Sequence, residues 1–289
     1  MRILAIGNPC AHGGEARTQI QRFKSFLSQY PEHSHRIYET SQPKDSIRMA
    51  SEILEFDPDI ISIIGGDGTI NDVINVPEAR SKILHLIPAG SGNDFSHLIN
   101  GRITEKESFE LVFSPNRRTV DCGQCNHQYF LNGVGIGFDG SIARETVRMK
   151  LPFSTSWKYW IAIFKHVLFY RSTPISIQWE SNKVEEKLFM ISIANGREYG
   201  GGFRVSPESD PDDGSFNLVL VKALHPLKRL FQIPVVEKGR HLKKSFVVQH
   251  LVKNVVLTSS QPMHAHLDGE IMISNRFEIL YSGKLTLVV

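Results

Sequence analysis

Short apolar runs alternate with amphipathic stretches between residues 1 and 116. The apolar runs are continuous rather than alternating, a pattern typical of strands in a parallel sheet that is covered on both faces. Between them, apolar residues recur at helical spacing, which indicates helices with one buried face. The predicted strands are Ile3–Ile6, His35–Tyr38, Asp59–Ile64 and Lys82–Ile87, and the predicted helices are Glu15–Ser28 and Asp45–Phe56. This order predicts an α/β domain over residues 1–116, built on a doubly wound parallel sheet.

The pattern changes near Arg117, where short strands separated by turns begin. The predicted strands here are Thr119–Cys122, Gln128–Leu131, Val184–Ile193, Ser215–Val221, Phe246–Leu257 and Arg276–Tyr281, and the predicted helices are Thr155–Tyr170 and Pro226–Lys238. Strands joined by turns favour an antiparallel arrangement. We therefore predict a second domain over residues 117–289, a mainly antiparallel β-sandwich whose last strand or strands could return to the first domain. A cleft between two such domains is the default position for a ligand.

Composition narrows the class of protein. The chain has 289 residues, of which 41% are hydrophobic and 22% charged, the profile of an ordinary globular protein. Three cysteines do not make a disulfide framework, so we expect a reducing, cytoplasmic environment. The first residues form a short apolar run before Gly7-Asn8-Pro9, which indicates a strand rather than a signal peptide. No apolar stretch is long enough for a transmembrane helix, and a net charge of +3 is too small to indicate nucleic-acid binding.

The strongest chemical signal is the segment Gly65–Thr69, which reads Gly-Gly-Asp-Gly-Thr. It follows a predicted buried strand and precedes a helical pattern. Glycines allow the backbone to approach a phosphate closely, and we predict that Thr69 caps the following helix, whose first N–H groups would then face an anion. The alternative is a simple glycine-rich turn at the end of a strand, but the full pentapeptide after a buried strand favours phosphate binding.

Two similar turns follow two other predicted strands: Pro88–Phe95, which reads Pro-Ala-Gly-Ser-Gly-Asn-Asp-Phe, and Asn8–Gly14, which reads Asn-Pro-Cys-Ala-His-Gly-Gly. Because the carboxyl ends of parallel strands share one edge of a sheet, we expect the three turns to lie together where open α/β sheets bind ligands. The pattern GxxxxGK[ST] is absent from the sequence, so the chain is not a P-loop protein.

These motifs resemble those of the diacylglycerol kinase catalytic domain family, which also contains sphingoid-base kinases and the bacterial YegS-like lipid kinases. Gly65–Thr69 followed by Asn71, together with Pro88–Phe95, looks like the nucleotide-binding motifs of that family. Four further segments match in the family's order over essentially the whole chain: Asn8-Pro9, Asn132–Asp139, Asp212–Gly214 and Leu267–Glu270. Many unrelated proteins contain Gly-Gly-Asp-Gly, but few contain all six segments in this order.

The resemblance implies an N-terminal nucleotide domain, a C-terminal β-sandwich domain, and ATP with Mg²⁺ as cofactors. It implies the following nucleotide-binding residues: Asn8, Thr40, Gly65, Gly66, Asp67, Gly68, Thr69, Asn71, Asp72 and Ser91. Asp268 corresponds to the family's proposed general base. Asp213, with carbonyl oxygens near Asp210 and Ser215, corresponds to a second, structural Mg²⁺ site.

Elementary chemistry is consistent with these roles. Phosphoryl transfer needs positioning and charge neutralisation more than covalent chemistry, and Mg²⁺ prefers one or two carboxylates plus phosphate and water oxygens. Taken without the resemblance, Asp268 and the segment Asp210–Gly214 are also compatible with solvated acidic turns. His264 and His266 alternate on a predicted strand next to Asp268, where they either line the site or face solvent.

Two segments bear on how the chain would reach a lipid. Trp157–Tyr170 combines a wide apolar and aromatic arc with basic residues Lys158, Lys165 and His166, as in a helix that lies at a membrane interface, although a helix packed on the core has the same pattern. Lys222–Lys244 contains seven basic residues and one acidic residue. Such a segment either docks on anionic lipid or forms a solvated face.

We therefore predict an ATP- and Mg²⁺-dependent kinase that phosphorylates a hydroxyl of a lipid such as diacylglycerol or a sphingoid base, in peripheral contact with the anionic inner face of the membrane. A homodimer is compatible with the sequence. Two alternatives stay open. An NAD kinase shares the Gly-Gly-Asp-Gly-Thr motif and a β-rich second domain, but it needs no aromatic helix. A regulator that binds nucleotide or lipid without catalysis would need neither Asp67 nor Asp268 as a reactive group.

Overall fold

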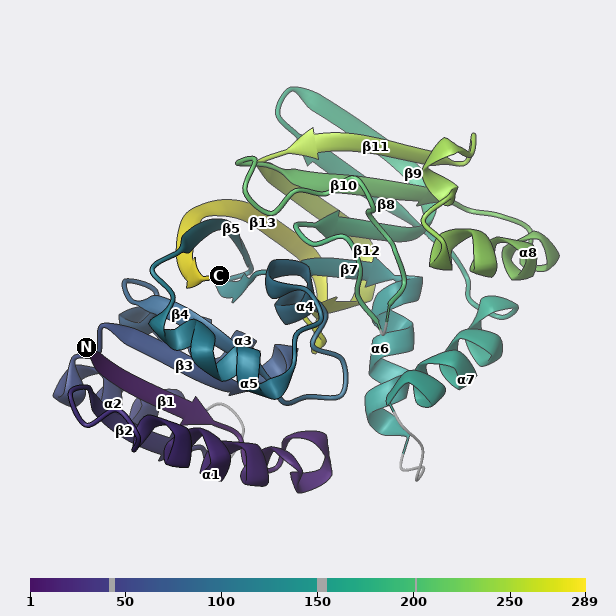
Figure 1. The fold of residues 1–289 in the computed structure, drawn as a ribbon. Helices are drawn as coiled ribbons and strands as arrows, with labels where there is room; N and C mark the ends of the chain where they lie inside the picture. The colour runs from purple at the N-terminus through teal and green to yellow at the C-terminus, as the bar shows by residue number, and fades with distance from the viewer. Residues whose placement is uncertain (42–44, 150–154, 201) are drawn as a thin grey trace. The chain divides into compact units, whose positions relative to one another are not determined.

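The computed structural model describes residues 1–41, 45–149, 155–200 and 202–289. The chain divides into two compact units (Figure 1). The first comprises Met1–Val120 together with Lys284–Val289, and the second comprises Asp121–Gly283. Two strands, β5 (Arg117–Cys125) and β13 (Glu270–Val288), pass from one unit into the other along the chain. Each unit is described by itself.

The first unit is built on a parallel sheet with the strand order β2-β1-β3-β4. Its strands are β1 (Arg2–Gly7), β2 (Ser34–Glu39), β3 (Ile60–Gly65) and β4 (Ile83–Pro88). Its α-helices are α1 (Ala16–Leu27), α2 (Ser46–Phe56), α3 (Asp67–Ile74), α4 (Asp94–Asn100) and α5 (Glu105–Glu110), with 3₁₀ turns at Ala11–Gly14, Pro77–Ala79 and Leu111–Phe113. The end of β13 completes the sheet, because Thr286 and Leu287 pair in parallel with β4.

The inner strands of this sheet are buried on both faces, as their continuous apolar sequences predict. Every residue of β3 is buried, and so are five of the six residues of β1. Ile3 and Ala5 pack on one face with α1 and α5, while Leu4 and Ile6 alternate to the opposite face, where α2 contacts β1. This two-sided burial confirms the predicted doubly wound layer.

The second unit is mainly antiparallel. Its strands, besides parts of β5 and β13, are β6 (Gln128–Phe130), β7 (Gly133–Gly137), β8 (Thr173–Trp179), β9 (Asn182–Ala194), β10 (Phe216–Lys222), β11 (Val247–Val252) and β12 (Asn254–Leu267). Its α-helices are α6 (Phe138–Arg148), α7 (Thr155–Val167) and α8 (Pro226–Glu237), and a 3₁₀ turn spans His241–Lys243.

Two apolar layers hold the second unit together. Along β10, Leu218 and Leu220 point into a core formed between strands, whereas Val219 and Val221 point the other way into a cluster with the helices α6, α7 and α8. This alternation follows from the two-residue period of a strand. The unit is therefore a β-rich body with helices packed against one of its faces, as Figure 1 shows.

The structure divides one predicted strand in two. Phe246–Leu257 forms β11 and β12, which are separated at Lys253. The reason is a change of partner: β11 pairs with β10, whereas β12 pairs with β13 and β8. Two consecutive exposed polar residues, Lys253 and Asn254, interrupt the alternation at the break, and this is the mark that the sequence carries of it.

Candidate active site

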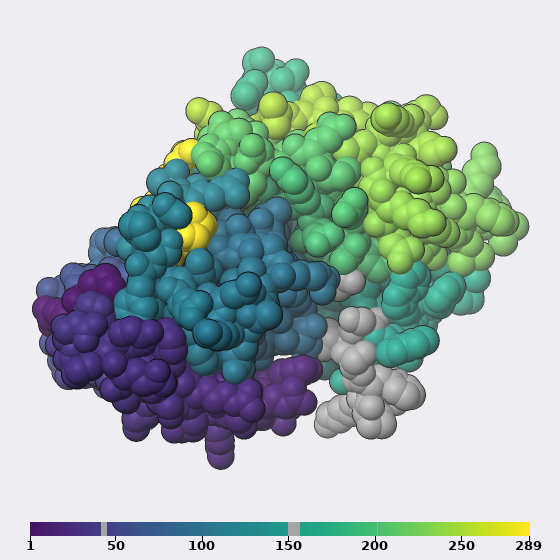
Figure 2. Space-filling view, in the orientation of Figure 1, coloured from purple at the N-terminus to yellow at the C-terminus, as the bar shows by residue number. Residues whose placement is uncertain are grey.

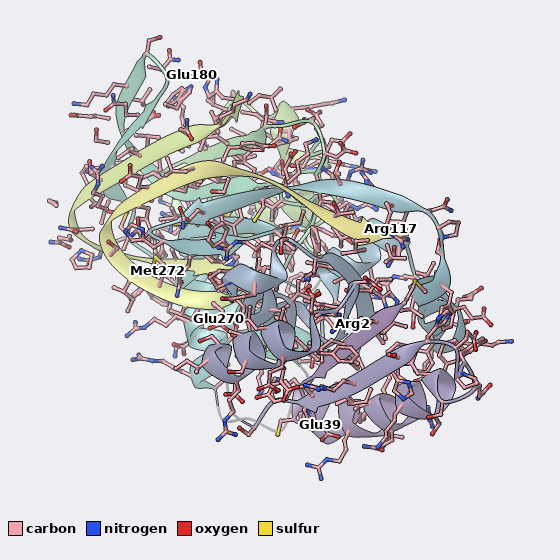
Figure 3. The ribbon with its side chains drawn as sticks, turned by 90° about the vertical axis from the view of Figure 1, so that its left-hand side faces the viewer. Arg2, Glu39, Arg117, Glu180, Glu270 and Met272 are labelled. Atoms are coloured by element: carbon pink, nitrogen blue, oxygen red, sulfur yellow. The ribbon has the colours of Figure 1, made fainter. Side chains whose placement is uncertain are left out.

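The turns that the sequence singles out lie at one edge of the first unit, where its parallel strands end. Asn8 follows β1, and its N–H donates to the carbonyl oxygen of Ile64 in β3 at 3.1 Å. Thr40 follows β2, and its N–H donates to the carbonyl oxygen of Gly7 at 2.8 Å. Ala89 follows β4, and its N–H donates to Gly65 at 2.9 Å. Glu39, labelled in Figure 3, marks this edge at the end of β2, and Arg2 marks the opposite end of β1.

The two glycine-rich turns touch each other through their backbones. A Cβ atom added to Gly90 would lie 2.4 Å from the Cα atom of Gly66. The side chain of Asn93 fixes the second turn, because its Oδ1 accepts from the N–H of Gly90 at 2.8 Å and its Nδ2 donates to the carbonyl of Gly90 at 2.9 Å. Only glycine fits at this contact, so Gly66 and Gly90 keep both backbones bare and close together.

Asp67 links the same two turns. It is the first residue of α3, and its carboxylate accepts from the N–H groups of Asp94 and Phe95 at 3.2 Å each. Those two residues begin α4, so Asp67 caps the neighbouring helix. Burial raises the pKa of Asp67 above its ordinary value, against the effect of the two backbone hydrogen bonds. The Asp67 carboxylate therefore holds the second turn in place, and it also lies next to the glycine-rich backbone of both turns.

Asp94 is a further candidate that the residue-by-residue prediction leaves out. A Cβ atom added to Gly92 would lie 3.3 Å from Oδ2 of Asp67 and 4.0 Å from Oδ2 of Asp94. Two carboxylates beside one glycine turn form a donor set that suits Mg²⁺ when phosphate and water oxygens complete it. The described residues contain no group of three or more His, Cys, Asp or Glu side chains that could hold a metal by themselves. In the sequence, Asp94 is distinguished only by its position in the segment Pro88–Phe95, directly after Asn93.

The predicted cap at Thr69 is wrong. The residue that precedes α3 is Gly66, and Thr69 lies inside the first turn of the helix, where it is buried over Gly65. The N–H groups of Thr69 and Ile70 both donate to the carbonyl of Gly66. Asn71 is also buried, and its Oδ1 accepts from Nδ2 of Asn75. A helix can begin on glycine without a side-chain cap, so Thr69 was not needed there.

The side chain of Asn8 fixes the shape of the loop that follows β1. Oδ1 of Asn8 accepts from the N–H of Cys10 at 3.0 Å, which closes an Asx turn. A cavity of about 380 Å³ lies between this loop and the turn after β4, with His12, Gln19, Arg22 and Gly90 among its lining residues. Its volume falls within the usual range for small-molecule sites. Ser91 is exposed on the adjoining turn, and Asp72 lies in α3.

Asp268 occupies a backbone nest in the second unit. It lies in the turn between β12 and β13 with a φ of 49°, a left-handed conformation that aspartate tolerates. Its Oδ2 accepts from the N–H of Leu131 at 2.8 Å, and its Oδ1 accepts from those of Asn132 and Gly133 at 2.9 Å. The carboxylate is half-buried, so these three bonds fix its orientation while leaving part of it accessible.

A buried ion pair holds the strand that leads to Asp268. His266 Nε2 lies 3.0 Å from Oδ2 of Asp139, and both side chains are almost fully buried. The hydroxyl of Tyr159 donates to Oδ1 of Asp139 at 2.8 Å. Gly135 makes room, because a Cβ atom there would lie 2.1 Å from Asp139 and 2.4 Å from His266. His266 therefore faces the interior, which excludes the solvent-facing alternative.

Each partner of this pair offsets the effect of burial on the pKa of the other. Burial alone would lower the pKa of His266, but the facing Asp139 carboxylate raises it above the ordinary value of 6.5. Burial would raise the pKa of Asp139, but His266 and two tyrosine hydroxyls lower it below 3.8. Such compensation is the usual condition for burying charge.

The residues predicted to hold a second metal ion lie in one acidic turn before β10. Oδ1 of Asp213 accepts from the N–H of Ser215 at 2.9 Å, and Asp210 lies exposed in the same turn. Beneath the turn, the fully buried Asp121 accepts from the N–H of Gly214 at 2.7 Å and from the hydroxyl of Tyr281 at 2.9 Å. Asp121 is thus a positioning residue for this turn that the sequence did not reveal.

A parallel α/β unit with paired glycine turns, followed by an antiparallel β-rich unit with a fixed aspartate, is the arrangement that the sequence predicts for a phosphotransferase. Family comparison agrees: the diacylglycerol kinase catalytic domain matches residues 2–125, and the YegS C-terminal NAD kinase beta sandwich-like domain matches residues 132–280. The chain belongs to the YegS-like diacylglycerol kinase family and is a lipid kinase.

Individual relatives show how far the likeness extends. A diacylglycerol kinase from Bacillus subtilis (strain 168) is 26% identical over 270 residues, which cover 90% of this chain and 89% of the relative. One from Staphylococcus haemolyticus (strain JCSC1435) is 25% identical over 252 residues, covering 86% and 73%. A crystal structure of a diacylglycerol kinase from Bacillus anthracis strain Sterne superposes with a TM-score of 0.72 at 20% identity, covering 99% and 96%, which supports the fold.

Proposed function

We propose that this lipid kinase transfers the γ-phosphoryl group of ATP to a hydroxyl of diacylglycerol or a chemically similar lipid alcohol. The observation that carries the proposal is the contact between the two glycine-rich turns, with Asp67 and Asp94 beside it. The turns would hold the phosphates through backbone N–H groups, as glycine-rich turns at strand ends do. Asn8, Thr40 and Ser91 follow the neighbouring strands, where they would contact the same nucleotide.

We propose that Asp67 and Asp94 hold Mg²⁺ together with the phosphates. When bound, the ion would neutralise phosphate charge during transfer. The two carboxylates fit this task because both lie beside Gly92, where an approaching phosphate would meet backbone rather than side chains. For the acidic turn, we propose that Asp213 and carbonyl oxygens near Asp210 and Ser215 hold a second Mg²⁺ that is structural; Asp121 would keep that turn in shape.

In the proposed reaction, a bond forms between the lipid oxygen and the γ-phosphorus, the bond from that phosphorus to the β–γ bridging oxygen breaks, and ADP leaves. Asp268 takes the proton of the lipid hydroxyl. Its three backbone donors hold the carboxylate in one orientation, so that an unshared oxygen lone pair is aimed before the substrate arrives. Such general-base assistance contributes roughly 10²–10⁴-fold to the rate.

We also propose that the lipid is taken from an anionic membrane surface on the cytoplasmic side, with the chain as a peripheral protein. Among the described residues, no helix combines the length and the apolar character needed to cross a bilayer. A lipid substrate that remains in its bilayer requires the enzyme to come to the surface.

The test is transfer of label from [γ-³²P]ATP, with Mg²⁺, to a panel of lipid alcohols in anionic mixed micelles and, in a parallel tube, to NAD. We expect organic-extractable product with the wild type and a loss of roughly 10²–10⁴-fold with Asp268→Asn. Asp57→Asn, on the surface of the first unit, is the matched control. Label in NADP, or an unchanged rate with Asp268→Asn in a folded protein, would contradict the proposal.

A further inference from the structure

We infer that α7 and α8 together form a docking face for an anionic phospholipid bilayer. The inference rests on the proposed function in one respect, namely that the lipid substrate resides in a membrane. The docking face consists of five apolar side chains with adjoining cations. The apolar members are Trp157, Phe164, Phe169, Leu227 and Phe231.

The two helices contact each other and are joined by hydrogen bonds, so their exposed side chains lie in one region of the second unit. The guanidinium of Arg229 in α8 donates to the carbonyl oxygens of Val167 at 3.1 Å and Tyr170 at 2.7 Å, which caps the C-terminal end of α7. Arg229 is buried and lies over the ring of Phe189. Arg229 is one of the seven basic residues of the segment Lys222–Lys244, and in the structure it fastens the two helices together. In Figure 2, α7 and α8 adjoin as teal and yellow-green surfaces.

The apolar side chains point away from the core. Each of the five is between 59% and 79% exposed, whereas Ala162, Ile163 and Val167 on the other side of α7 are buried. Leu227 and Phe231 lie one turn apart on α8, and Trp157 and Phe164 lie two turns apart on α7. Residues two apart on a helix point to nearly opposite sides, so Leu227 and Phe231 point away from the buried Arg229 and towards solvent. The exposed apolar side chains therefore lie on the outer sides of two helices that Arg229 holds together.

Cations adjoin this apolar group without acidic partners. Lys228 lies between Leu227 and Phe231 in the sequence, and Arg171 follows Phe169 by two residues. Four more, Lys238, Arg240, Lys243 and Lys244, follow at the end of α8. None of these six forms an ion pair with the described acidic residues. By contrast, Lys165 and His166 of the predicted basic stripe face Glu145, so the cations that form no ion pair lie mainly in the segment that follows α8.

This combination identifies the occupant as an anionic bilayer. Aromatic side chains are suited to the boundary between headgroups and acyl chains, and cations beside them attract anionic headgroups. If a second copy of the chain packed against this face through the same two helices, its carboxylates would have to pair with the cations. Glu237 is the only acidic residue within α8, and α7 has none. Exposed aromatics beside surplus positive charge are the signature of a membrane-surface helix.

The experiment is co-sedimentation of the full chain with vesicles of phosphatidylcholine alone and of phosphatidylcholine with phosphatidylglycerol, without ATP or Mg²⁺. We expect binding to the anionic vesicles. Phe164→Ser with Phe231→Ser should weaken the apparent partition coefficient by about tenfold or more, because each buried apolar side chain contributes strongly to partitioning. The matched control is Leu251→Ser with Ile273→Ser, two exposed apolar residues elsewhere in the same unit.

The charge contribution is tested separately. Lys243→Glu with Lys244→Glu should weaken binding by about tenfold or more near 0.1 M salt, and the difference should shrink near 0.5 M salt. Lys24→Glu with Lys106→Glu changes the net charge equally in the first unit and should have little effect. Equal vesicle binding by the wild type and the Phe164/Phe231 variant would overturn the inference. So would conversion of a dimer into a monomer by that variant, since a second copy would then cover the face.

Activity on a short-chain, water-soluble diacylglycerol distinguishes this inference from the proposed function. The Phe164/Phe231 variant should keep that activity while losing activity on lipid in vesicles. If the wild type bound anionic vesicles but phosphorylated no lipid alcohol in either form, the proposed function would fail and the docking face would stand.

Discussion

At the scale of single residues, the candidate site depends on carboxylates that the backbone already holds. Asp268 accepts three backbone N–H groups and Asp67 accepts two. Side chains fixed in this way need little further ordering when a substrate arrives, which is the main contribution that a protein makes to phosphoryl transfer. The buried pair of Asp139 and His266 fixes in the same way the strand β12, which leads to Asp268.

We predict that this pair stabilises the fold in a defined pH window. The folded-state pKa of His266 is raised, so its contribution is complete below pH 6.5 and is lost as the pH rises through the folded value. The folded-state pKa of Asp139 is lowered, so its contribution is complete above 3.8 and is lost as the pH falls through the folded value. His266→Gln leaves Asp139 buried without its cation and should lower the free energy of unfolding by about 3 kcal/mol near pH 6.

Urea unfolding measures this effect, which should shrink as the pH rises through the folded-state pKa of His266, where the wild type loses the cation. His225→Gln, an exposed histidine of the same unit, serves as the control. A loss of stability that does not change with pH from about pH 6 upwards would show that His266 acts by packing alone.

At the scale of elements, the turns at the ends of β3 and β4 work because two backbones meet without side chains between them. The hydrogen bonds of Asn93 and Asp67 hold the turn after β4 from two sides. The contact cannot be made by either strand alone, and it requires glycine at Gly66 and Gly90 together.

Gly90→Ala should therefore lower both stability and nucleotide affinity. The added methyl group would lie 2.4 Å from the Cα atom of Gly66, which is backbone and has no rotamer to change. We expect a loss of about 1–3 kcal/mol in the free energy of unfolding, as for other overpacked sites, and weaker binding of ATP in a titration with Mg²⁺. Gly283→Ala has open space around the new methyl group, so it reports backbone strain alone; an equal effect of both substitutions would contradict the packing argument.

At the scale of the whole molecule, the last residues of the sequence return to the first unit. The last residues of β13 pair with β4, and Leu287 and Val288 are fully buried. Ser114 donates to the carbonyl oxygen of Val289, which ties the strand to the end of the α/β sequence. The unit that carries the proposed nucleotide-binding turns is thus completed only after the second unit has been synthesised.

Leu287→Ala should destabilise the first unit although it lies near the end of the chain. Removal of a fully buried leucine costs about 2–5 kcal/mol. Hydrogen exchange in β1, β3 and β4 should accelerate, whereas tryptophan fluorescence should be much less affected, since Trp157, Trp160 and Trp179 all lie in the second unit. Leu280→Ala, at a partly exposed position of the same strand, is the control. Unchanged exchange in β1, β3 and β4 would refute the role of Leu287.

Much of this molecule follows from local sequence. Continuous apolar runs place β1, β3 and β4 in a covered parallel sheet, because only strands buried on both faces can be apolar at every position. The carboxyl edge follows in turn, because the strands are parallel, and it brings Asn8, Gly66 and Gly90 together. The ordered motifs were specific enough to indicate the family. These features depend on neighbours in the chain or on a repeating pattern, so the sequence carries them directly.

Tertiary structure alone decided the rest, because the partners are far apart in the chain. Asp121 lies under the turn of Asp213, and Asp139 pairs with His266 across 127 residues. The sequence marked His266 only as one of two alternating histidines and Arg229 only as one of several cations; burial and hydrogen bonding turned the first into half of an ion pair and the second into a helix cap. A buried polar group needs a partner of suitable charge and geometry, and periodicity along the chain determines that it is buried but not which distant residue meets it.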